Sequence, residues 1–185
     1  MAVETIKLTI MANFIAIGVA LGYILAFLPN IELVTLVIFL SGYTLGWKSG
    51  LFVGFSTEFI YSNFNLYGPA PLHVLTAQVI AMAVAGVAGG LCSTITKSLK
   101  EKISSRLIFM LMGIIVTLFF DFMTTAADVI IINGDVAFFL ARVFTGLPFF
   151  AAHIFVNGFL FFFLLPALLK NLQKMPIFQR LQKNI

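Results

Sequence analysis

Side chains that can bind ligands or transfer protons stand inside otherwise apolar segments of this 185-residue chain. Such groups are costly in an apolar surrounding and normally face a protein interior or a wet cavity. If the segments are helices, residues three or four apart share a face. Three polar faces result, and they carry Gly54, Glu58, Tyr61, Ser62 and Asn65; Asp121, Thr124, Thr125 and Asp128; and Phe149, His153 and Asn157.

We expect these faces, joined by Gln78, to meet at one depth and to form a cup that binds a small molecule. The convergence of three faces carries this expectation, because a single buried polar residue can equally serve to pair two helices. The cup predicts a ligand-binding protein.

Motifs of catalysis or cofactor binding are missing from the sequence. It contains no GxxxxGK[ST], HExxH, GxSxG or CxxC pattern and no histidine cluster. Asp121 and Asp128 stand two helical turns apart, roughly 10 Å along an axis, which is too far for a shared proton. We therefore expect no enzymatic activity, no cofactor and no metal site. An intramembrane hydrolase, with Glu58 and His153 as its pair, stays an alternative.

The composition is that of a membrane protein: 61% of the residues are hydrophobic and 10% are charged. Soluble domains carry about 25% charged residues, so a soluble enzyme and a disordered chain are excluded. The net charge of +4 does not indicate a nucleic-acid partner, because a basic excess in a lipid-embedded chain reflects its cytoplasmic loops. The single cysteine, Cys92, excludes an intramolecular disulfide.

Six apolar segments can be marked, and a bilayer crossing takes ~20 residues. They run over residues 7–28, 31–46, 50–66, 72–94, 105–132 and 137–170. The sixth contains Pro148, and we expect it to begin or to kink there. The sequence predicts one domain, 1–185, that is an all-α integral membrane protein with a six-transmembrane-helix bundle.

The basic residues predict the orientation of these spans. With six spans and a cytoplasmic N-terminus, Arg142 alone faces outward and every other basic residue faces the cytoplasm, as the positive-inside rule requires. The inner residues are Lys7, Lys48, Lys97, Lys100, Lys102, Arg106, Lys170, Lys174, Arg180 and Lys183. Both termini are then cytoplasmic. The polar cup lies in the outer half of the membrane, and the inner half is almost purely apolar.

Small residues recur at intervals that let helices approach closely. They are Ala12, Ala16, Ala20, Gly18 and Gly22 in the first span, and Ala81, Ala85, Gly86, Gly89 and Gly90 in the fourth. We expect the fourth-span stripe to pack inside this chain. The first span has one stripe more than a terminal helix needs, so its second stripe is a candidate surface for a partner. The tail after Pro176 is either an amphipathic helix on the inner leaflet or a solvated end.

Over nearly its whole length, the chain resembles the substrate-binding S component of an energy-coupling factor (ECF) vitamin transporter. The likeness rests on size, six spans and the alanine stripe of the first span. It also rests on Pro-Asn-Ile-Glu-Leu-Val-Thr at 29–35, on the turn at 42–51 and on the loop at 63–71.

The resemblance implies a protein that captures a water-soluble vitamin or related micronutrient from outside under loops that act as lids. It implies that Ala12, Ala16 and Ala20 dock on a transmembrane coupling protein, which two ABC-type ATPases drive, and that the subunit topples to deliver its ligand inward. The gate would be the segment from Asn30 to Glu32. Together with the faces described above, the candidate ligand contacts are Asn30, Glu32, Glu58, Tyr61, Asn65, Gln78, Asp121, Thr125, Asp128, His153 and Asn157.

The resemblance also bears on ligand and location. Metal-transporting relatives begin Met-His, whereas this chain begins Met-Ala-Val, which disfavours nickel and cobalt ions. Residues 29–35, together with Gly68 and Pro69 in the loop before the fourth span, are similar to the corresponding segments of family subtypes assigned to cobalamin. Cobalamin is therefore a candidate ligand. We expect a multi-pass protein of a bacterial or archaeal plasma membrane. A structural scaffold of the rod-shape-determining type, which needs no ligand, stays the main alternative.

Overall fold

The computed structural model describes residues 3–96 and 102–182, and these residues form seven α-helices and no strand. The helices are α1 (Val3–Leu25), α2 (Val34–Leu45), α3 (Trp47–Asn63), α4 (Leu72–Thr96), α5 (Lys102–Ile131), α6 (Val136–Leu172) and α7 (Pro176–Gln182). The predicted all-α class is confirmed, and each predicted segment coincides with one of the first six helices to within a few residues at most bounds.

Four helices, α1, α4, α5 and α6, are long and apolar enough to cross a membrane. These four helices are compatible with a membrane-embedded protein. In contrast, α2 has 12 residues and α3 has 17. A 12-residue helix is roughly 18 Å long, well short of a hydrocarbon core about 30 Å thick.

The short helix α2 forms the centre of the bundle. Every residue from Val34 to Tyr43 is buried, and α2 contacts α1, α3, α4 and α6. The Phe39 ring meets that of Phe161 from α6 edge to face at 4.9 Å between centroids. Gly46, whose φ of 91° suits glycine, ends α2 and lets the chain turn directly into α3. Because α2 is short and buried on all sides, it fills only part of the length of the bundle interior.

Glycines bring α4 into main-chain contact with α2 and α3. A Cβ added at Gly42, Gly50 or Gly86 would overlap main-chain atoms of the facing helix. Close approach of this kind supplies the dispersion contacts that hold helices together in a lipid surrounding. The prediction that the small residues of the fourth span pack inside the chain is confirmed.

The first helix carries two small-residue stripes that face opposite ways. Gly18 and Gly22 are buried against Thr57 and Tyr61 of α3. The alanines face away from the bundle, and they are Ala12, Ala16 and Ala20. One stripe therefore packs internally, and the other lies on the outer surface of α1.

The sixth helix differs from its prediction. It begins at Val136, well before Pro148, and continues past both Pro148 and Pro166. Asp135 starts it, because its carboxylate accepts a hydrogen bond from the Phe138 N–H at 2.8 Å. Packing against α5 and this cap outweigh the missing N–H of Pro148, so a start at the proline is wrong, and the alternative of a kink there stays a prediction.

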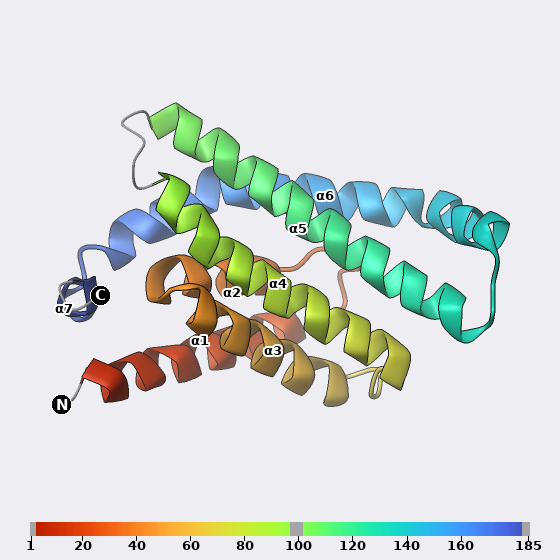
Figure 1. Cartoon of the computed structure of the whole chain (residues 1–185), viewed down its shortest axis with the longest axis horizontal. Helices are drawn as coiled ribbons and strands as arrows, with labels where there is room; N and C mark the ends of the chain where they lie inside the picture. Colours follow the sequence, from red (N-terminus) through yellow and green to blue (C-terminus); the bar gives the residue numbers. More distant parts are fainter. Residues whose placement is uncertain (1–2, 97–101, 183–185) are drawn as a thin grey trace.

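The two ends of the bundle differ in character. Both chain ends lie at one end, and the tight α5–α6 turn lies at the other (Figure 1). Lys7, Lys48, Arg106, Lys170 and Lys174 all belong to helix ends on the side of the termini, whereas Arg142 lies near the opposite turn. Lys97, Lys100 and Lys183 lie outside the described residues.

The C-terminal tail forms the short helix α7, which contacts α1 near the termini (Figure 1). Its Phe178 is buried and belongs to the hydrophobic core. This packing corrects the alternative of a solvated end, because Phe178 lies in an apolar site on the bundle itself, and the alternative of a helix on the inner leaflet stays a prediction.

Candidate functional site

A cavity of about 170 Å³ lies next to the N-terminus of α2. It exists because α1 ends at Leu25 and α2 begins only at Val34, so their connection crosses the middle of the bundle (Figure 1). That connection, with α3, α4, α5 and α6, walls the cavity. The short central helix therefore leaves an interior space that longer helices surround.

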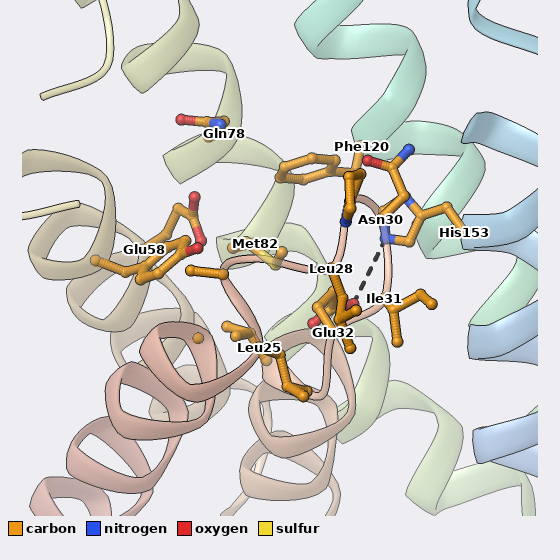
Figure 2. A pocket seen from close by; sticks show the side chains of 15 residues that line it. Leu25, Leu28, Asn30, Ile31, Glu32, Glu58, Gln78, Met82, Phe120 and His153 are labelled. Atoms are coloured by element: carbon orange, nitrogen blue, oxygen red, sulfur yellow. Dashed lines mark ion pairs between the residues drawn. The ribbon is translucent and has the colours of Figure 1, made fainter. Parts of the chain in front are cut away.

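Six polar residues line this cavity, and all six were predicted from the sequence. They are Asn30, Glu32, Glu58, Tyr61, Gln78 and His153. Glu58 lies on the α3 side and Glu32 with His153 on the α6 side, and Met82 and Phe120 lie between them (Figure 2). The cavity thus has two polar walls separated by apolar side chains.

Glu32 ties the α1–α2 connection to the rest of the bundle. Its Oε2 accepts the Thr35 N–H at 2.8 Å, which caps the first turn of α2. Its Oε1 accepts from Asn157 Nδ2 at 3.0 Å and lies 3.5 Å from His153 Nε2 (Figure 2). Burial alone would raise the pKa of the Glu32 carboxyl, but these contacts with His153, Asn157 and Thr35 outweigh burial and hold the pKa below its ordinary value.

Behind Glu32, His153 bridges α6 and α5. Its Nδ1 lies 2.9 Å from Asp121 Oδ1, and because an ionised carboxylate can only accept, the imidazole donates. The Phe120 ring stands perpendicular to the imidazole at 6.0 Å. Asp121 and Asn157 do not line the cavity but hold residues that do, so they position the site rather than face it.

Glu58 is the carboxylate of the α3 wall. Its side chain is buried, with 2% of the residue exposed, and its Oε1 accepts from the Ser62 hydroxyl at 2.7 Å. The same hydroxyl lies 3.0 Å from Gln78 Oε1. A serine has one O–H proton, so the two acceptors share it.

Asn30 sits at the bend of the α1–α2 connection with a φ of 57°. Asparagine adopts this left-handed conformation more readily than most residues. The bend turns the chain so that residues 28–32 all reach the cavity. The predicted gate segment therefore forms one wall of the cavity.

Three predicted contact residues lie elsewhere. Asp128 accepts from Arg142 Nη2 at 2.7 Å and lies 3.1 Å from His73 Nε2, and with Thr125 it lines a separate pocket of about 310 Å³. Asn65 accepts the Tyr67 N–H in the turn after α3. The expectation of one cup for all three faces is thus corrected.

Axial rise explains this division. Asp128 stands about 10 Å further along α5 than Asp121, beyond the level of the α1–α2 connection. It therefore meets His73 at the start of α4 and Arg142 near the start of α6. Helical spacing places Asp128 on one face with Asp121 but does not predict this three-helix cluster, because His73 and Arg142 are isolated polar residues in their own segments.

Some lining residues were missed. Met82 follows Gln78 by four positions, so helical spacing places the two on one face of α4. Phe120 had no comparable signal among the many phenylalanines of the chain.

The other half of the bundle is less apolar than expected. It buries the hydroxyl side chains of Ser41, Ser93 and Thr96, each bonded to a main-chain carbonyl of its own helix, and that of Ser49, which bonds the carbonyl of Leu45 at the end of α2. Among the described residues, however, the buried carboxylates and the buried imidazole, Glu58, Asp121 and His153, all belong to the cavity or its support. No group of three or more His, Cys, Asp or Glu side chains in the described chain is arranged to hold a metal ion.

Comparison with known proteins gives no relative. No family model, no curated protein and no solved structure matches this chain.

Proposed function

We propose that this protein is the substrate-binding subunit of an ECF-type importer, embedded in a bacterial or archaeal cell membrane. One observation carries the proposal: a polar cavity lies at the centre of an apolar bundle, beneath a connection that one glutamate ties to α2 and α6. In this role, the cavity captures a water-soluble vitamin or related micronutrient. The α1–α2 connection covers it.

The hydrogen bonds and ion pairs around the cavity support binding rather than hydrolysis. The alternative enzyme needs Glu58 and His153 to act together. His153 instead contacts Asp121 and Glu32, and Glu58 bonds Ser62 on the opposite wall. A scaffold protein, for its part, has no need of buried carboxylates around a cavity, since they cost stability in a lipid surrounding.

In the proposed topology, all six helices from α1 to α6 lie within the bilayer, and α2 and α3 are the short ones. Both termini face the cytoplasm. The gathering of basic residues at the end that holds the termini supports this orientation, because basic residues are retained on the cytoplasmic side. The connection over the cavity then opens toward the outside.

A coupling protein driven by two ABC-type ATPases would complete the importer. The exposed stripe of Ala12, Ala16 and Ala20 supports this role, because a helix of a partner can approach closely over alanine side chains. The internal packing of α1 uses Gly18 and Gly22 and leaves the stripe free.

The cavity size favours a small ligand. Its volume of about 170 Å³ lies below the range of roughly 300–1,000 Å³ that is usual for drug-sized molecules. Cobalamin, which is larger than such molecules, would require the α1–α2 connection to move away from the bundle. A compact micronutrient fits the proposal with the smallest rearrangement.

Mass spectrometry of small molecules that co-purify with the full chain tests the proposal. We expect one water-soluble compound to be enriched over a mock preparation. Ala26→Trp, which places a large ring at a residue lining the cavity, should abolish the enrichment. Ile24→Trp is the matched control, because Ile24 lies two positions earlier, in the last turn of α1, and is exposed.

Two outcomes would contradict the proposal. One is the same set of compounds in the wild-type and the mock preparations. The other is a compound that Ala26→Trp retains in full while the variant stays folded, since that compound would bind outside the cavity.

A further inference from the structure

The cavity has an unbalanced charge. Its lining brings together the carboxylates of Glu32 and Glu58 and the imidazole of His153, and no lysine or arginine is among its lining residues. Arg142, the basic residue near the same end of the bundle, is paired with Asp128 in the separate pocket. Acidic groups therefore prevail around the space that a ligand would occupy.

The two carboxylates differ in how they are satisfied. Glu32 has the Thr35 N–H and the Asn157 amide as donors, and His153 lies beside it. Glu58 has, among the described residues, only the Ser62 hydroxyl, which it shares with Gln78. A carboxylate that is buried this deeply is stabilised when a positive or hydrogen-bonding partner approaches. The described chain therefore supplies Glu58 with no positively charged partner.

The apolar lining suits the same kind of partner. Tyr61 and Phe120 bring aromatic rings to the cavity, and Met82 brings a polarisable thioether (Figure 2). Aromatic faces attract cations, and they do so more strongly where water is displaced. In contrast, an anionic ligand would meet two carboxylates and no fixed positive group except His153, which already contacts Asp121 and Glu32.

We propose that the ligand of this cavity is a small organic cation whose charged nitrogen pairs with Glu58 beside Tyr61 and Phe120. The inference rests on the ligand-binding role proposed above and adds the chemical class of the ligand. Glu32, held by Asn157 and Thr35, stays with the α1–α2 connection and closes the cavity over the bound cation.

A fractionated cell extract provides the test. Water-soluble metabolites of the producing cells are passed over a chelating resin and separated at neutral pH into cation-exchange-retained, anion-exchange-retained and unretained fractions. Each fraction is titrated against the purified full chain, and its thermal stabilisation is recorded. We expect the cation fraction to stabilise the protein most strongly.

Two variants assign the effect to Glu58. With Glu58→Gln, the amount of cation fraction needed for half-maximal stabilisation should rise about ten- to a hundred-fold, as for loss of one hydrogen bond to a charged group. Glu4→Gln removes an exposed carboxylate from the first turn of α1 and should leave the titration unchanged. The comparison of fractions on the unaltered protein decides the question even if Glu58→Gln does not fold.

The outcomes separate this inference from the proposed function. Stabilisation by the anionic or unretained fraction alone would overturn the cationic ligand and leave a binding protein. Stabilisation that appears only when the chelating step is omitted would point to a metal ion and would also overturn it. If no fraction stabilises the protein, both the inference and the proposed function fail.

Discussion

At the scale of single residues, the site is a set of buried polar groups that are satisfied to different degrees. Polar type in an apolar stretch predicted Glu58, Gln78, Asp121, His153 and Asn157, because such side chains must face inward. Spacing did not predict their partners. The link from Asn157 to Glu32 spans 125 positions in sequence, and only the fold brings these two residues together.

The amide of Asn157 belongs to the support of the site. Asn157→Ala removes a donor from Glu32 and leaves a small void in a fully buried position. We expect a loss of about 1–3 kcal/mol in the free energy of unfolding, which is typical when a buried acceptor loses its donor. Equilibrium unfolding in detergent measures this loss. Asn171→Ala, at an exposed position of the same helix, should change little, and equal losses for both variants would contradict the role of Asn157.

The stability of the α1–α2 connection should depend on pH through Glu32. Because its pKa in the folded protein lies below its ordinary value, the folded chain gains stability above the unfolded pKa and loses it as the pH falls through the folded pKa. We expect the melting temperature of the wild-type protein to fall more on acidification than that of Glu32→Gln. Other groups near the cavity titrate in both proteins, so the difference between the two curves isolates Glu32. Superimposable curves would contradict this account.

At the scale of helices, the short α2 makes the cavity and the glycines of α4 hold it in place. The sequence predicted six apolar segments and the packing role of the fourth, since small residues at helical spacing have a direct steric meaning. It left open whether the sixth helix begins at Pro148 or continues through it with a kink, and the structure shows that the helix continues. The Asp135 cap and the contacts with α5 decide the start of α6, and they depend on the neighbouring helix as well as on local sequence.

Contact between α4 and its neighbours gives a steric prediction. Gly86→Ala forces a methyl group against the main chain of Gly50, so we expect a loss of about 1–3 kcal/mol or more in the free energy of unfolding. Gly158→Ala is the matched control, because its Cβ would meet only side chains of Ile114 and Met110 at 3.4 Å or beyond. That variant should be neutral or slightly more stable, since alanine favours a helix by about 0.5–1 kcal/mol. A Gly86→Ala protein as stable as the wild type would rule out the close approach.

At the scale of the whole molecule, composition predicted a membrane protein, because so few charges cannot cover a soluble surface, and the lengths of the apolar segments predicted helices. The division of the polar faces into a central cavity and a separate Asp128 pocket was beyond reach of the sequence. It depends on the level at which the α1–α2 connection crosses the bundle, and helical spacing within one segment carries no information about that level.

The exposed alanine stripe predicts a separation of two activities. Ala16→Trp places a large side chain on the outer face of α1, away from the cavity. In intact cells that also produce the partner proteins, we expect uptake of the compound that co-purifies with the wild type to be lost. Its binding to the purified variant should be unchanged. If binding is lost together with uptake, the stripe serves internal packing and not docking.

An experimental structure of the full chain, determined after saturation with the water-soluble extract of its own cells, tests the central claim most directly. We predict compact density for a non-protein molecule between Glu58 and Glu32, with the α1–α2 connection closed over it. A cavity that stays empty under saturation, or one that is filled by an acyl chain, would contradict the capture of a water-soluble solute.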